Sequence, residues 1–368
     1  MPRRVLERAT PEDDAAVRAL LRRTPMEGDI RLTFEREPDA ALSATVEGER
    51  HHVFVAREAD GAVTGLCSRA VRRVWVNGSL ARVGYLGQLR SERAAASIRH
   101  TIEAGFAACR ASRLDDELPF DYTSIMADNA TARRFLERGV RGLPRYVPLG
   151  GFRTLLVPVA SRRASSAPSG LTIERGAAVG AAPIASFLQA QYRAYQLAPV
   201  WTEGDLLSNE ATRDLSLDDF VVAMREGVIV GGAALWDQSE YRQSVVRGYA
   251  PWLGRVRGIA NAWYSMTGQP RLPAVGERLR IATISHFAVI DDDPAVAIAL
   301  IDRIRNTAVA RKLELLVLGL AESRPLVPAL RNRLRARILG SILYGVLYDG
   351  EESTGLDARP LHVEVATL

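Results

Sequence analysis

An internal repeat constrains the fold of this chain more than any other feature of its sequence. The pattern Leu6-Glu7-Arg8, followed by an apolar helix face, returns 167 residues later as Ile173-Glu174-Arg175 and a second such face. The same offset carries Val53–Ala56 onto Phe220–Ala223 and Gly65 onto Gly232. An offset kept over about sixty residues preserves loop lengths as well as apolar periodicity. The sequence therefore predicts two copies of one folding unit.

The boundary between the copies is also visible in the sequence. A length of 368 residues suits two domains of ordinary size. The stretch 161–170 consists mainly of Ser, Ala, Pro, Gly and Arg without apolar periodicity, which is typical of a linker. We predict an N-terminal domain over 1–160, the linker over 161–170 and a C-terminal domain over 171–368. Each domain should have an α/β fold, with a twisted mixed sheet flanked by helices.

Composition indicates a globular protein and argues against several functions. Apolar residues make up 47% and charged residues 25% of the chain. No apolar run approaches the roughly 18 residues that cross a bilayer, and the first residues lack the apolar stretch of a secretory signal. We therefore expect a cytoplasmic protein with no membrane contact. Cys67 and Cys109 lie in apolar patterns, so we expect buried, inert thiols and no metal site.

The net charge of +5 and the isoelectric point near 9.4 raise the question of nucleic-acid binding. The basic residues are almost all Arg and alternate with acids along the chain. Nucleic-acid binders instead concentrate their charge on one face or tail. The tract Arg331–Arg337 is dense enough to allow either a solvated edge or a nucleic-acid contact, and we expect the former.

Within the first copy the pattern predicts strands and helices in a definite order. A helix starts at Thr10-Pro11, and a loop follows it. The predicted elements after that loop are a hairpin of Val53–Ala56 and Val63–Ser68, strands Arg73–Val76 and Ala81–Leu89, a helix carrying Ile98, Ile102 and Phe106, a strand Tyr122–Met126, a short helix Asn129–Arg138 closed by Gly139, and a strand Phe152–Val159.

The second copy repeats this plan with one insertion. Its fourth strand, Ile281–Val289, follows the counterpart by about 198 residues, the separation of Gln88 and His286. This exceeds the offset of 167 by about 31 residues, which are added to the repeat. The region 236–280 that contains them is rich in aromatic residues, including Trp252 and Trp263. Aromatic side chains bring large apolar areas, so this region can be a substrate-facing wall, a contact between the halves or a small satellite core.

The order of elements and the segment from Asn129 to Gly139 resemble the GNAT family of acyl-CoA-dependent N-acetyltransferases. The resemblance covers both halves. It implies two tandem GNAT-like domains, acetyl-CoA as the co-substrate, and transfer of an acetyl or other short acyl group to an amine. The acceptor is a small molecule or a peptide, and a homodimer is possible.

In that family the pyrophosphate of acetyl-CoA binds at the turn after the fourth strand. Free N–H groups at a helix N-terminus attract an anion there. The resemblance therefore implies a cofactor site formed by Leu89, Arg90, Arg93, Ala96 and Ser97, with Asn129 after the fifth strand. Ala96 and Ile98 stand where the family has a glycine and a small residue. In the second copy the acids 291–293 occupy this turn and would repel a pyrophosphate.

Acyl transfer needs an acid for the leaving thiolate and a base for the amine. The family's acid is often a Tyr in the short helix, where this chain has Leu136. The nearby phenols are Tyr122, Tyr85 and Tyr146, and we take the first two as candidate acids. Gln88 on the fourth strand cannot accept a proton, whereas its counterpart His286 can, so His286 is the candidate base. Glu27 and Glu35 are alternative carboxylates.

These departures leave a second hypothesis open. The chain can be a non-catalytic binding protein that kept the duplicated fold and lost its cofactor loops. Binding of acetyl-CoA to the native state distinguishes the two, because such binding raises the melting temperature.

Overall fold

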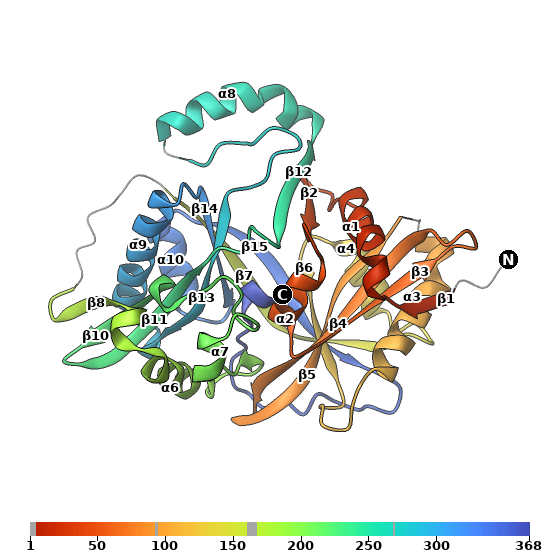
Figure 1. Cartoon of the computed structure of the whole chain (residues 1–368), viewed down its shortest axis with the longest axis horizontal. Coiled ribbons are helices and arrows are strands. Elements are labelled where there is room, and N and C mark those ends of the chain that lie inside the picture. The colour runs from red at the N-terminus through yellow and green to blue at the C-terminus, as the bar shows by residue number, and fades with distance from the viewer. Residues whose placement is uncertain (1–4, 93–94, 160–167, 268) are drawn as a thin grey trace.

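The computed structural model describes residues 5–92, 95–159, 168–267 and 269–368 (Figure 1). The predicted linker lies largely outside these residues. The first half contains β1 (Val5–Arg8), α1 (Asp14–Arg23), β2 (Ile30–Glu35), α2 (Ala41–Glu47), β3 (Arg50–Arg57), β4 (Val63–Val76), β5 (Ser79–Ser91), α3 (Ala95–Ala111), β6 (Asp121–Met126), α4 (Ala130–Glu137) and β7 (Arg145–Pro158).

The second half repeats this order with additions. It contains β8 (Leu171–Arg175), α5 (Gly176–Val179), α6 (Ala181–Tyr192), β9 (Ala198–Pro199), α7 (Glu203–Leu207), β10 (Phe220–Arg225), β11 (Val228–Trp236), β12 (Gln243–Tyr249), α8 (Pro251–Thr267), β13 (Ile281–Val289), α9 (Pro294–Ala310), β14 (Leu315–Ala321), α10 (Leu326–Leu334) and β15 (Arg337–Leu347). A single turn of 3-10 helix, Val365–Thr367, follows near the end of the chain.

The strand registers confirm the repeat. Leu6 pairs with Ala56 in the first half, and Ile173 pairs with Ala223 in the second, both at the offset of 167. The next strand pair differs by one residue, since Ala56 pairs with Gly65 and Ala223 pairs with Gly231. The structural equivalent of Gly65 is therefore Gly231, and the predicted match to Gly232 is wrong by one position.

Two predicted elements of the first half differ in the structure. Val63–Ser68 and Arg73–Val76 form one continuous strand, β4. The residues between them include Arg69 and Arg72, which an apolar pattern treats as exposed, but both side chains are buried against partners. The predicted loop after the first helix contains β2 and α2. The first half therefore places four strands of the large sheet before α3, namely β1, β3, β4 and β5, while β2 pairs with β12.

The two halves exchange strands within one 13-stranded mixed sheet. β15 from the second half lies between β6 and β7, and β7 from the first half lies between β15 and β14. Both contacts of β15 and both contacts of β7 are antiparallel ladders. The sheet is flanked by helices, as predicted, but each half completes its sheet with a strand from the other.

Helices cover both faces of the first half. Val17 and Leu20 of α1 pack with Val55 of β3 on one face. Phe54, the preceding residue on β3, packs with α3 and α4 on the other face, because consecutive strand residues point to opposite sides. Cys109 is buried on α3, Cys67 is half-buried on β4, and neither forms a disulfide.

The aromatic-rich insertion joins the two halves. β12 pairs antiparallel with β2 from the first half, from Gln243 opposite Glu35 to Tyr249 opposite Ile30. α8 follows β12 and extends away from the sheet at the top of Figure 1. The strand pairing identifies β12 as a contact between the halves. Among the helices of the described residues, none combines the length and apolarity needed to cross a bilayer.

A glycine at the start of the parallel pair gives a stability prediction. Gly84 on β5 lies opposite Asp121 on β6, and a Cβ at Gly84 would overlap the Asp121 carboxylate and the Arg69 guanidinium. We expect Gly84→Ala to lower the free energy of unfolding by about 1–3 kcal/mol, as overpacked core sites do. Urea unfolding measures this change.

Gly204→Ala provides the matched control. Gly204 lies in α7, where an added Cβ meets only ordinary contacts. That substitution should leave the unfolding free energy unchanged or raise it slightly. Equal effects of the two substitutions would contradict the assigned role of Gly84.

Candidate active site

Two parallel strands of the first half part from each other midway along their length. β5 and β6 pair only at Gly84 with Asp121 and at Tyr85 with Tyr122. Beyond these residues β5 continues to Ser91 beside β4, and β6 continues to Met126 beside β15. We call this opening the first fork. β13 and β14 form the second fork, since their pairing ends at Thr283 and Val317.

A β-bulge lies on the upstream strand of each fork. In β5 the pairs Gly87 with Ser68 and Arg90 with Leu66 enclose one extra residue, and Gln88 has a φ of 52°. In β13 the bulge falls at His286, which also has a φ of 52°. Positive φ is uncommon outside glycine, so the shared value marks equivalent positions. The predicted correspondence of Gln88 and His286 is confirmed.

The two candidate phenols stand side by side at the base of the first fork. The rings of Tyr85 and Tyr122 lie 5.1 Å apart. The Tyr122 hydroxyl accepts a hydrogen bond from Nη1 of Arg72 at 2.9 Å, and the Arg72 guanidinium lies 4.7 Å from the centre of the Tyr85 ring. Burial raises the pKa of Tyr85 to about 12, although Arg72 opposes this effect.

A buried carboxylate connects the bulge to this group. Glu47 at the end of α2 accepts from Nε2 of Gln88 at 3.2 Å, and it lies 3.1 Å from Nη2 of Arg36 and 3.1 Å from Nε2 of His51. Burial alone would raise the pKa of Glu47, but Arg36 and His51 hold it well below its usual range. Glu47 is therefore an anion that fixes the Gln88 side chain.

The chain near residue 368 also reaches the first fork. Arg72 donates to the carbonyl oxygens of Glu47 and Thr367. Arg242, from the second half, donates to the carbonyl oxygens of Ala366 and Leu368. Burial, with a contribution from Arg36, lowers the pKa of Arg242 to about 10. The face of the fork opposite α3 therefore combines residues from both halves.

The residues predicted to bind the cofactor lie along the mouth of the fork as far as they are described. Leu89 is exposed and Arg90 is half-buried, next to the bulge. Burial and the nearby Arg36 guanidinium lower the pKa of Arg90. Asn129 caps α4 by accepting from the N–H of Ala132 at 3.1 Å.

Three of the predicted cofactor residues lie wholly or partly outside the described part of the chain. Arg93 lies outside the described residues. Ala96 and Ser97 belong to the first turn of α3, where the backbone is described and the side chains are not.

The second fork is covered by a segment of the chain itself. Glu364 accepts from the N–H of His286, at the bulge, at 2.8 Å, and from the N–H of Ala366 at 3.1 Å. Val365 packs over Gly319 of β14, where a larger residue would clash. Burial raises the pKa of Glu364 to about 7. At the following helix, Asp293 accepts from the N–H groups of Ala295 and Val296, which confirms that this N-terminus is capped by its own carboxylate.

His286 lies inside this second half and not beside the two tyrosines. Its side chain is fully buried, with its ring 4.3 Å from that of Trp201 and 5.1 Å from that of Phe220. Burial lowers the pKa of His286 to about 3, so the imidazole is neutral. The structure therefore brings Tyr85, Tyr122 and Gln88 together and leaves His286 apart.

Comparison with known proteins identifies the fold. No family model and no curated protein matches the sequence. A GCN5-related N-acetyltransferase from Sphaerobacter thermophilus matches with a TM-score of 0.57 at 14% identity, over 96% of this chain and 99% of that one. N-myristoyltransferase from Saccharomyces cerevisiae with bound myristoyl-CoA matches with a TM-score of 0.60 at 10% identity, over 100% of this chain and 84% of that one.

The chain has a tandem GNAT fold. The resemblance in the sequence is thereby confirmed at the level of fold. In GNAT terms β5 and β6 are the fourth and fifth strands of the first half, and β13 and β14 are those of the second.

Several residues at the first GNAT fork were missed by sequence reasoning. They are Arg36, Glu47, His51, Arg72 and Arg242. Glu47 and Arg36 lie in the stretch predicted as a loop, and Arg242 comes from the other half. The alternative carboxylate Glu35 is buried 2.5 Å from the Thr33 hydroxyl and is paired with Arg247, and Glu27 is exposed. The sequence offered one signal for these residues, the arginines at 69–73 between two predicted strands. Charged side chains inside a continuous strand need partners, so they indicate buried ion pairs.

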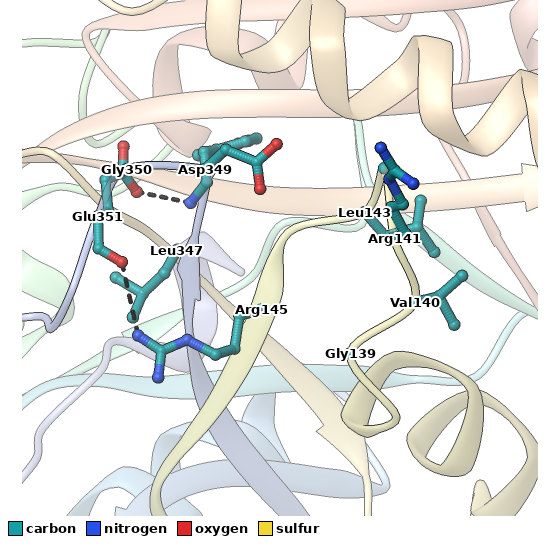
Figure 2. Close-up of a pocket in the computed structure, with 11 residues that line it drawn as sticks. Gly139, Val140, Arg141, Leu143, Arg145, Leu347, Asp349, Gly350 and Glu351 are labelled. Atoms are coloured by element: carbon teal, nitrogen blue, oxygen red, sulfur yellow. Dashed lines mark hydrogen bonds between the residues drawn. The ribbon is translucent and has the colours of Figure 1, made fainter.

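Two hollows among the described residues lie outside the first fork. The larger, of about 440 Å³, lies between the segment 139–145 after α4 and the segment 347–351 after β15 (Figure 2). In it Nη2 of Arg145 donates to the carbonyl oxygen of Glu351 at 3.5 Å. A smaller hollow of about 340 Å³ lies beside Glu322 and Leu361. Neither is lined by a residue predicted for the site.

The buried Glu364 predicts a pH dependence of stability. Its pKa rises from 4.5 to about 7 on folding, so folding is favoured by this group below about pH 4.5, and that contribution is lost as the pH rises through 7. The loss is about 3 kcal/mol. Glu364→Gln keeps an acceptor oxygen and does not titrate, so the difference in unfolding free energy between pH 5 and pH 8 should change by up to that amount.

Urea unfolding of both proteins at the two pH values measures this difference. The neutral His286 and His362, whose pKa values are also shifted by burial, contribute in both proteins and cancel in the comparison. An identical pH profile for the two proteins would show that Glu364 does not titrate in this range.

Proposed function

We propose that this protein is an acyl-CoA-dependent N-acyltransferase that moves an acetyl or short acyl group to an amine. The observation that carries the proposal is the first fork, where the strands part beside the bulge at Gln88 and above Tyr85 and Tyr122. The Tyr122 hydroxyl there accepts a hydrogen bond from Arg72. The acyl-CoA would run along the turn from Leu89 to Ser97, with Arg90 and Arg93 near its phosphates. Asn129 would flank the same opening.

The second half indicates how the thioester would be held. There a carboxylate oxygen of Glu364 sits on the N–H of His286 at the bulge. The equivalent N–H in the first half belongs to Gln88. A thioester carbonyl oxygen at this N–H would be polarised as negative charge develops on it during attack. Positioning amine and thioester together supplies much of the remaining rate effect.

The proton transfers can be assigned to residues at the fork. The amine nitrogen attacks the thioester carbon, the carbon–sulfur bond breaks, and the thiolate takes the proton of the Tyr122 hydroxyl. Arg72 donates to that phenol oxygen and stabilises the phenolate left behind. The amine loses its proton to His51, which Glu47 orients at 3.1 Å. We do not assign His286 this role, because its aromatic surroundings exclude an acceptor amine.

The base of the fork favours a short acyl group. The ladder closes at Tyr85 and Tyr122, and one residue beyond it the Thr123 hydroxyl donates to the carbonyl of Leu86 at 2.7 Å. An acyl chain entering between the strands would meet these rings after a few carbon atoms. Acetyl-CoA is therefore the proposed co-substrate, and the acceptor is a small-molecule or peptide amine.

The second candidate function is a binding protein without acyl transfer. Glu364 and Asp293 fill the second fork and its helix terminus, and Leu136 replaces the family's acid on α4. Glu364 and Asp293 occupy N–H groups in the second half that an acyl-CoA would otherwise use, which supports this second candidate for that half. Leu136 lies in the first half, where the Tyr122 hydroxyl is proposed to supply the acid instead.

Acetyl-CoA binding separates the two functions. We expect saturating acetyl-CoA to stabilise the native state by about 2.7 kcal/mol at one hundred times its Kd, which raises Tm by several degrees. Arg90→Ala should reduce the shift because it removes a cation at the mouth of the fork. Arg175→Ala, an exposed arginine on β8, is the control and should keep the full shift. No shift in the unaltered protein at millimolar acetyl-CoA would favour the binding protein.

Tyr122→Phe tests the assigned acid. The variant keeps the ring contact with Tyr85 and loses the ionisable hydroxyl, so kcat should fall by about 10²–10⁴ while the acetyl-CoA thermal shift persists. Release of free CoA in the presence of a panel of amines measures the rate. Tyr146→Phe is the control, since Tyr146 packs with Phe106 and Tyr344 on the α3 side of the sheet. Equal rates for the two variants would remove Tyr122 from the mechanism.

A further inference from the structure

Helix α8 carries an exposed apolar stripe that the acyl-transfer site does not explain. Its members follow a spacing of four, three, four and three residues, and their side chains are between 40% and 85% exposed: Trp252, Val256, Ile259, Trp263 and Met266. Residues at this spacing share one face of a helix. A contiguous apolar face of this kind on a soluble protein marks an interaction surface.

Within the residues that the structure describes, the contacts that hold α8 lie on its other side. The inner side of α8 is held by the segment that follows it, through Arg257 donating to the carbonyl of Pro273 at 2.7 Å and through two hydrogen bonds between Asn261 and Leu272. Successive helix residues are rotated by 100°, which places the centre of the stripe about 160° from this inner side. Figure 1 shows α8 at the outer edge of the molecule, beyond β12 and β2.

We propose that the stripe is the interface of a homodimer in which two copies of α8 pack antiparallel. A two-fold axis at Ile259, the middle residue, places Ile259 against itself, Trp252 against the partner's Met266 and Val256 against the partner's Trp263. Each pair combines a large with a smaller or flexible side chain, and sulfur–aromatic contacts are favourable. The stripe is thus complementary to itself, which a two-fold interface requires.

The charges on α8 are compatible with this arrangement. The helix contains no acidic residue, and Arg255 is the cation on the outer side. In the antiparallel pair the two Arg255 side chains lie about 12 Å apart along the axis, beyond the Debye length of about 8 Å. Arg255 instead approaches the partner's Trp263, where a cation over an indole ring is favourable.

The size of the stripe fits a dimer better than a membrane contact. Two tryptophans and three aliphatic side chains from each copy would bury about 1,000 Å² or more in total, which meets the lower limit of a specific interface. Helices that lie on anionic membranes carry clusters of basic residues along the polar face. Here Arg257 is already bonded to Pro273, and the outward side has Arg255 as its basic residue.

Sedimentation velocity on the full chain tests the proposal. At micromolar concentrations we expect a species of twice the 40.2 kDa chain mass. Ile259→Glu places two carboxylates at the axis and should raise the dimer Kd by about 30-fold or more. Gly258→Glu adds the same charge at an exposed position outside the stripe, where a side chain meets no neighbour, and should leave the dimer intact.

Cross-linking tests the orientation. Mixed Trp252→Cys and Met266→Cys proteins should be joined by a short bismaleimide, while each alone should be joined poorly. The unaltered protein controls for Cys67 and Cys109.

Three results would overturn the proposal. They are a monomer at all accessible concentrations, a dimer that withstands Ile259→Glu, and an Ile259-dependent binding of the monomer to anionic phospholipid vesicles.

Discussion

The buried guanidinium of Arg69 holds the root of the first fork, and the proposed site depends on it. Its Nε and Nη2 donate to Asp121 at 3.0 and 2.8 Å, and it pairs with Glu117. Burial would lower the pKa of Arg69, but the two carboxylates raise it above its ordinary value. Removing one member of such a group would leave an unpaired buried charge, which costs several kcal/mol. Asp121 is also the residue at which β6 joins β5, so the network fixes where the strands begin to part.

The repeat gives the protein two forks, and the groups that surround them differ. Both have a left-handed residue at the bulge, Gln88 in one and His286 in the other. In the second fork the bulge N–H is taken by Glu364, and the helix terminus is taken by Asp293. The segment that fills this fork continues to the first, where Arg72 and Arg242 bind its last carbonyls. The segment that fills the second fork therefore also packs against the first fork. Acyl transfer is proposed only for the first fork.

The sequence was sufficient to predict the fold but only part of the candidate site. Apolar periodicity and a constant offset sufficed for the repeat, because both are set by local geometry. Tyr85, Tyr122 and Gln88 were within reach, since they lie on predicted strands and the family pattern points to those strands. Glu47, Arg36 and Arg242 were not, because each is buried through partners that lie far away in the sequence. The prediction of two separate strands around 69–72 was wrong for the same reason. In the sequence, the buried arginines of β4 look like the polar residues of a solvated turn.

The sequence by itself determined that the chain is a duplicated α/β protein with two equivalent fourth strands, because side-chain alternation along a strand and helix periodicity are local properties. Only the tertiary structure decided which strand completes which half, because β7 and β15 read as ordinary strands and their exchange depends on long-range pairing. It also decided which fork is filled, since that depends on where the segment 361–368 packs. Pairing between distant segments leaves no periodic trace in the residues that form it.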